Sequence, residues 1–147
     1  MSTSAWRTAW KISWADRLLF AEAFVRLAFV RLAVLALPGR VVLSRLGAPQ
    51  TETSREDDPA ARELVSRVRW ALAAASRRAP WRCKCLEQAI VARKMLESRG
   101  IATTLYLGVA RRGSLEAHAW LRCGSRIVAG EAGISAFTVV STFGNRR

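Results

Sequence analysis

Two residue types in this chain are suited to nucleophilic catalysis, namely three cysteines and a single histidine. Cys83 and Cys85 stand one residue apart in the stretch WRCKCLEQAIVARKML, where the pattern predicts the start of a helix. Backbone N–H groups at a helix N-terminus favour a thiolate, and they would also stabilise an oxyanion formed on an attacked carbonyl group. A cysteine on an apolar helix face is more often a packing residue, so both roles are open at this point.

His118 is the residue that favours chemistry over packing. It lies in the stretch EAHAWLRC, which is typical of a β-strand, and alternation places it on one face with Trp120 and Arg122. The other face carries Ala117, Ala119, Leu121 and Cys123. An imidazole held against a thiol acts as its general base, although a histidine beside a tryptophan can also be structural. We hypothesise that the His118 face meets Cys85.

Glu131 is the predicted third member of this site. The pair Gly124-Ser125 has the character of a two-residue hairpin loop, which would pair Cys123 with Arg126. Counting outward from that pair brings His118 opposite Glu131 on the same face, provided that no bulge interrupts the pairing. The carboxylate would then orient the ring nitrogen that does not contact the thiol.

A metal site is the alternative use of the same residues, which would be a zinc ligand set of Cys83, Cys85, His118 and Cys123. The spacing argues against this alternative. His118 and Cys123 are five residues apart in a strand and so face opposite sides of the sheet, and the two earlier cysteines lack the usual two-residue gap. We therefore expect no metal ion and no other cofactor.

The helix that would carry the nucleophile is predicted over residues 85–99, with Gly100 after its end. One stripe of this helix consists of Cys85, Ala89, Ala92 and Leu96. The small side chains in the stripe would let the helix approach a sheet closely, so Cys85 points towards the sheet and Cys83 does not. Strand-like stretches follow, separated by turns, and a helix followed by an antiparallel sheet indicates an α+β fold.

Two further helices are predicted before this core. The first spans residues 16–37, begins with a capping box at Ser13 and Asp16, and ends at Pro38-Gly39. A polar stretch at residues 48–58 is typical of a linker, and a second helix over residues 59–78 would be capped by Asp58. We divide the chain into an N-terminal helical segment and linker, residues 1–58, and a core, residues 59–147.

The first helix is apolar almost all round, yet Glu22, Arg26 and Arg31 interrupt it. Each of these groups would be costly in lipid, so we expect neither a membrane span nor membrane association. The residues leave two interpretations open. The helix either packs against the rest of the protein, or it docks on a partner or a membrane surface.

The composition sets further bounds. A length of 147 residues with 51% hydrophobic residues suits one folded domain. The net charge of +13 is spread along the chain without a nucleic-acid-binding motif, so we expect no nucleic-acid partner. Three cysteines do not suggest a disulfide framework and the N-terminus is not built like a secretory signal, so we expect a cytoplasmic protein.

Three stretches, CLEQAIVARKMLESRGIATTLYLGV, AHAWLRCGSRIVAG and FTVVSTFG, resemble the transglutaminase-like cysteine proteases of bacterial lasso-peptide biosynthesis. The resemblance is to the separate leader-peptidase subunit, the half of the split B protein that lacks the leader-recognition domain. It runs from about Asp16 to the end of the chain. It implies a papain-like core, with Cys85 as nucleophile and His118 as base.

The resemblance also implies a function and partners. The enzyme would cut a ribosomally made precursor between leader and core, and an asparagine-synthetase-like cyclase would then close the macrolactam. A small separate leader-recognition protein would present the leader peptide. The alternative is a non-catalytic scaffold of the same fold. The family often has an aspartate near Ala129, Gly130 and Glu131. Since Gly130 has no side chain to orient an imidazole, either Glu131 would replace that aspartate or the site would work mainly as a dyad of Cys85 and His118.

Overall fold

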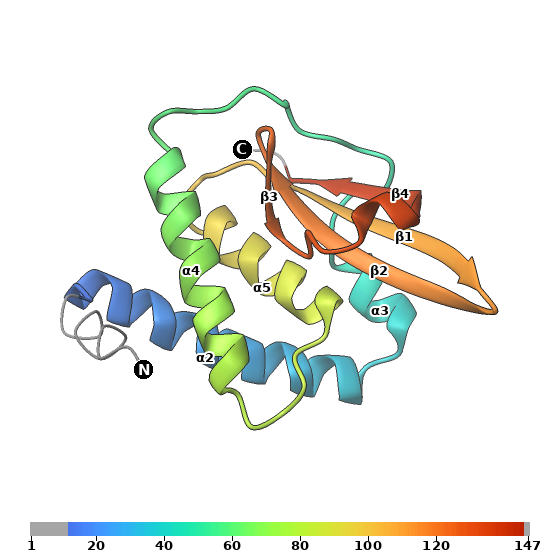
Figure 1. The fold of residues 1–147 in the computed structure, drawn as a ribbon, viewed down its shortest axis with the longest axis horizontal. Helices are drawn as coiled ribbons and strands as arrows, with labels where there is room; N and C mark the ends of the chain where they lie inside the picture. Colours follow the sequence, from blue (N-terminus) through green and yellow to red (C-terminus); the bar gives the residue numbers. More distant parts are fainter. Residues whose placement is uncertain (1–11, 146–147) are drawn as a thin grey trace, which may run out of the picture.

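Helices occupy the N-terminal part of the chain and strands the C-terminal part (Figure 1). The computed structural model describes residues 12–145. The elements are α2 (Trp14–Ala36), α3 (Gly39–Ser44), α4 (Arg62–Arg78), α5 (Cys85–Glu97), β1 (Thr104–Arg112), β2 (Ser114–Cys123), β3 (Arg126–Ala129), the 3-10 helix η2 (Ile134–Ala136) and β4 (Thr138–Gly144). The predicted α+β fold, with the cysteine helix packed on an antiparallel sheet, is confirmed.

The helix boundaries follow local capping chemistry. The Ser13 hydroxyl accepts a hydrogen bond from the Asp16 N–H at 3.1 Å, so the predicted cap of α2 is confirmed. The start of α4 was predicted too early. The Asp58 carboxylate accepts from the Ala60 N–H at 2.9 Å and forms a turn, so the helix begins only at Arg62. The short helix α3 was not predicted.

The four strands form one antiparallel sheet in the order β3-β2-β1-β4. Cys123 pairs with Arg126, which confirms the two-residue loop between β2 and β3. The last strand, β4, returns to the far side of β1 rather than extending the sheet beyond β3. This order makes β2 an inner strand with a short neighbour, β3, at the edge.

One core joins the helices to the sheet. Helix α5 contacts β2 on one side and both α2 and α4 on the other (Figure 1). Its predicted stripe is confirmed, because Ala89, Ala92 and Leu96 are fully buried. The sheet contributes Leu105, Ala119, Leu121 and Phe143 to the same core. Helices from both sides of residue 58 therefore share one hydrophobic interior.

Helix α2 is apolar on two sides but buries only one. Leu19, Ala23 and Leu27 pack into the core. A second stripe, at steps of three, four and seven residues, leaves more than half of each side chain exposed; we call it the outer stripe, and it consists of Trp14, Leu18, Val25, Phe29, Leu32 and Leu35. Within residues 12–145, the helices fall short of the length and apolar character that crossing a membrane requires.

A strap, residues 47–58, crosses one end of the sheet on the way from α3 to α4. Arg122, which is only 3% exposed, donates hydrogen bonds to the carbonyl oxygens of Thr53 and Ser54. The same guanidinium donates to the Tyr106 hydroxyl at 2.8 Å, and Asp57 accepts from the Ser125 N–H at 2.7 Å. These contacts fix the strap to the ends of β1 and β2.

Candidate active site

Cys85 is the first residue of α5, and a buried carboxylate anchors the turn that presents it. Glu87, 1% exposed, accepts a hydrogen bond from the Lys84 N–H at 3.2 Å and so caps the helix. Its other oxygen accepts from Arg31 of α2 at 2.9 Å. The N-terminus of the cysteine helix is thus tied to a neighbouring helix through an ion pair.

The Cys85 thiol is half-buried and packs against the core, as the helical stripe predicted. Its position in the first turn leaves unpaired backbone N–H groups of the helix beside it. Such N–H groups are the donors that an oxyanion requires during acyl transfer. The arrangement therefore suits a nucleophile, although it also suits a packing residue.

The other two cysteines are less suited to attack. Burial raises the pKa of the Cys83 thiol, and the negative charge of Glu87 raises it further. Burial also raises the pKa of Cys123, with Asp57 as a second cause. A raised pKa keeps a thiol protonated at neutral pH, and the protonated form is a poor nucleophile.

His118 lies on β2 with its ring held on several sides. The ring packs against Trp120 and Phe137, with centroid separations of 5.8 and 5.0 Å. Its Nε2 is 2.7 Å from the carbonyl oxygen of Gly130. Because a carbonyl oxygen can only accept, Nε2 must carry the proton, which leaves Nδ1 of a neutral ring as the acceptor. Nδ1 is therefore the atom able to take a proton from a thiol.

Gly130 reaches the imidazole because it lacks a side chain. Its φ is +79°, in the left-handed region, and a Cβ atom there would collide with the Ala119 carbonyl oxygen and meet Trp120 at 3.0 Å. Only glycine lets the chain pass this close to β2. The expectation that Gly130 cannot orient an imidazole was wrong, since it considered side chains and the main-chain carbonyl performs the task.

The predicted register of Glu131 is corrected by a bulge. Beyond the hairpin, the β2/β3 pairing shifts between Arg122 and Leu121, and Val128 is the additional residue on β3. A one-residue shift turns later side chains to the other face of a strand. Glu131 accordingly does not face His118, and its carboxylate forms an ion pair with Arg69 of α4.

In the structure, the His118 ring contacts the Gly130 carbonyl, and the Glu131 carboxylate contacts Arg69. Ala119 and Leu121 belong to the core on which α5 packs, so alternation turns the His118 ring to the other face of β2. Among the hydrogen bonds within residues 12–145, none joins the Cys85 thiol to the ring. The pairing of Cys85 with His118 stays a prediction about the reacting complex.

Comparison with known families decides the family to which this fold belongs. The family whose model matches is described as the Transglutaminase-like superfamily, and the match covers residues 27–142. The chain belongs to the transglutaminase-like superfamily. The matched part of this transglutaminase-like protein includes Cys85, His118 and Gly130. No curated protein and no solved structure matches the chain.

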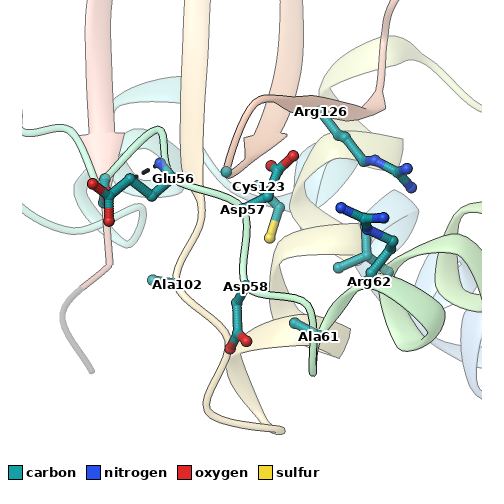
Figure 2. Close-up of a pocket in the computed structure, with 11 residues that line it drawn as sticks. Glu56, Asp57, Asp58, Ala61, Arg62, Ala102, Cys123 and Arg126 are labelled. Atoms are coloured by element: carbon teal, nitrogen blue, oxygen red, sulfur yellow. Dashed lines mark hydrogen bonds between the residues drawn. The ribbon is translucent and has the colours of Figure 1, made fainter.

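A separate hollow in this transglutaminase-like protein lies under the strap (Figure 2). Asp57 and Asp58 of the strap, Arg62 and Arg126 line it together with Cys123. Neither Cys85 nor His118 borders it, so the hollow is distinct from the candidate site. In the part of the chain that the structure describes, no three histidine, cysteine or carboxylate side chains are grouped as a metal site requires.

Proposed function

We propose that this transglutaminase-like protein is a cysteine endopeptidase that removes the leader peptide from a ribosomally made lasso-peptide precursor. The observation that carries the chemical part is the hydrogen bond from His118 Nε2 to the Gly130 carbonyl, since it leaves Nδ1 free to act as a base. The substrate class rests on the resemblance of the sequence to leader peptidases.

The reaction would proceed in two acyl-transfer steps. The Cys85 sulfur attacks the scissile carbonyl carbon while His118 Nδ1 takes the thiol proton. The resulting imidazolium gives this proton to the leaving amine as the peptide bond breaks. A water molecule, deprotonated by the same nitrogen, then hydrolyses the thioester and restores the thiol. The N–H groups in the first turn of α5 would stabilise the oxyanion in both steps.

The proposed partners need a docking surface, and α2 provides one. Its outer stripe exposes large apolar side chains in a continuous row, a feature that marks interaction sites on soluble domains. We assign this stripe to the small leader-recognition protein. The net charge of +13 would favour acidic leader and cyclase surfaces by long-range attraction. We place the assembly in the cytoplasm, where the three thiols stay reduced.

The second candidate function is a non-catalytic scaffold within the same biosynthetic complex. It is favoured by two observations: within residues 12–145 no hydrogen bond joins the Cys85 thiol to the His118 ring, and strand alternation turns the ring away from the face of β2 on which α5 packs. Catalytic hydrogen bonds in apo structures are often long or poorly aligned, but catalysis by this pair would also require the His118 segment of β2 to turn towards α5 when substrate binds.

The test is incubation of the protein with precursor peptides, with and without the leader-recognition protein, and detection of the released core by mass spectrometry. Cys85→Ala should abolish leader removal, while Cys83→Ala and Cys123→Ala, which change partly buried thiols of raised pKa, should retain it. Equal loss in all three variants would favour a structural role, and release that persists in Cys85→Ala would exclude this thiol as the nucleophile.

A further inference from the structure

We propose that Arg69 is a positioning residue, which fixes the Gly130 carbonyl and through it selects the His118 tautomer with an unprotonated Nδ1. Its effect on reaction rate rests on the proposed function, whereas its effect on the tautomer does not. Arg69 lies on α4, and its side chain reaches across to the end of β3.

Arg69 holds the chain on both sides of Gly130. Its Nη1 donates to the Ile127 carbonyl oxygen at 3.2 Å, and its Nη2 donates to the Glu131 carboxylate. One acceptor precedes Gly130 by three residues and the other follows it directly. The guanidinium therefore spans the segment whose Gly130 carbonyl contacts the imidazole. We call these two contacts of Arg69 the clamp.

The Gly130 carbonyl needs such a clamp because the sheet no longer holds it. β3 ends at Ala129, so Gly130 lies just beyond the paired strand. Gly133, also with a positive φ, follows three residues later. Glycine has more backbone freedom than other residues, so a segment with two of them keeps a defined carbonyl direction only when other contacts restrain it.

The clamp acts on geometry more than on stability. The side chains of Arg69 and Glu131 are 52% and 61% exposed, and exposed ion pairs contribute little to folding. Arginine is suited to this position because its planar fork donates to two acceptors at once. Lysine presents a compact charge and cannot reproduce that arrangement.

The clamp also gives Glu131 a different role from the one predicted for it. Its carboxylate anchors Arg69, and Arg69 also binds the Ile127 carbonyl oxygen, so the chain is held on both sides of the carbonyl that contacts the ring. Glu131 thus acts on His118 from two contacts away. The charge of Glu131 is not needed for this, since an amide oxygen in its place would still accept from the guanidinium.

The test uses the fact that the chain has one histidine. In the ¹⁵N-labelled full-length protein, its two ring nitrogens give unambiguous signals, and protonated and unprotonated nitrogens have well-separated shifts. At alkaline pH, where imidazoles are neutral, we expect the wild-type protein to be protonated at Nε2. Arg69→Ala should give a mixture of the two tautomers. Arg69→Lys should give a mixture in which the fraction protonated at Nε2 lies between those of the wild type and Arg69→Ala. Arg77→Ala removes an exposed arginine from the same helix and should match the wild type.

The outcomes separate this proposal from the proposed function. A wild-type ring protonated at Nδ1, or an Arg69→Ala spectrum identical to that of the wild type, would overturn the positioning role. Where precursor cleavage is measurable, Arg69→Ala should lower kcat by about three- to fivefold with KM unchanged, within the weak energy of an exposed pair. A protein that cuts no precursor but shows the tautomer change would contradict the proposed function and support the positioning role of Arg69.

Discussion

The carbonyl oxygen of Gly130 lies 2.7 Å from Nε2 of His118, so a residue without a side chain holds the only imidazole of the chain. A carbonyl group orients a ring as a carboxylate does, but it carries no charge and does not titrate. The imidazolium formed during reaction would therefore receive dipolar rather than ionic stabilisation at Nε2. The orientation of the ring therefore depends on the backbone at Gly130.

Gly130→Ala should destabilise the protein more than Gly133→Ala. Both glycines have a positive φ, +79° and +76°, so either substitution strains the backbone. A Cβ atom at Gly133 meets nothing within 4 Å, whereas at Gly130 it collides with the Ala119 carbonyl oxygen. We expect an additional loss of about 1 to 3 kcal/mol at Gly130, measured as the free energy of unfolding in urea. Equal losses in the two variants would show that the close approach to β2 is not required.

Glu131→Gln should leave precursor cleavage within about twofold of the wild-type rate, because an exposed charge pair contributes little and the amide oxygen can still accept from Arg69. The measurement is the initial rate of core release at saturating precursor. A loss of about a hundredfold or more is the range seen when a general acid–base partner is removed. Such a loss would support the role predicted from the sequence, in which Glu131 orients the imidazole.

The rate at which iodoacetamide alkylates Cys83 and Cys123 should depend strongly on pH. Burial raises the pKa of both Cys83 and Cys123, so the thiolate fraction of each is small at neutral pH and grows only under alkaline conditions. We expect slow alkylation of these two residues at neutral pH and acceleration as the pH rises, measured by peptide mapping at several time points. Fast neutral labelling of Cys123 would contradict the burial that the fold imposes on it.

Glu22→Gln should reduce the loss of folding stability that occurs as the pH falls into the acid range. Hydrogen bonds from Arg99, and more weakly from Arg26, lower the pKa of Glu22 below its ordinary value of 4.5. A lowered folded-state pKa gives stability that is present above the unfolded-state value and is lost as the pH falls through the folded-state value. The variant should be less stable than the wild type at neutral pH and equal to it in strong acid, measured by urea midpoints. A difference that persists in acid would assign the effect to packing.

Substitution of the outer stripe of α2 should weaken binding of the leader-recognition protein without unfolding the chain. Phe29→Gln combined with Leu32→Gln changes two side chains that are mostly exposed, so the urea midpoint should move little. Leu115→Gln, an exposed leucine on β2, is the matched control. Calorimetric titration should show weaker binding for the double variant alone. Unchanged binding would place the partner elsewhere on the molecule.

Local patterns were enough to predict those parts of the site that depend on one element. The buried stripe of α5 follows from helical periodicity, and the pairing of Cys123 with Arg126 follows from the two-residue loop between them. The position of Glu131 depended on an uninterrupted ladder, and the bulge at Val128 interrupts it. The partner of Glu131, Arg69, comes from a helix 62 residues away, a contact that no local pattern contains.

The contact between Gly130 and His118 was missed for a different reason. Side-chain donors and acceptors are visible in a sequence, whereas a main-chain carbonyl gives no compositional signal. The signal that was present is the glycine itself, which follows a strand at a position where the chain must approach its neighbour closely. The α+β fold was accessible because the cysteine helix and the hairpin are both encoded locally, whereas the superfamily came from the resemblance of three stretches to known proteases.

The ion pair between Glu87 and Arg31 makes the stability of the cysteine helix depend on α2. A fragment that begins at Pro59, where the sequence suggested the core begins, would lack α2 and would leave the Glu87 carboxylate of the cysteine helix without its counter-ion. An unpaired buried charge costs about 3 to 5 kcal/mol, which is comparable to the whole stability of a small domain. We expect such a fragment to fold only when α2 is added back as a separate peptide, because α2 supplies both the counter-ion of Glu87 and part of the hydrophobic core.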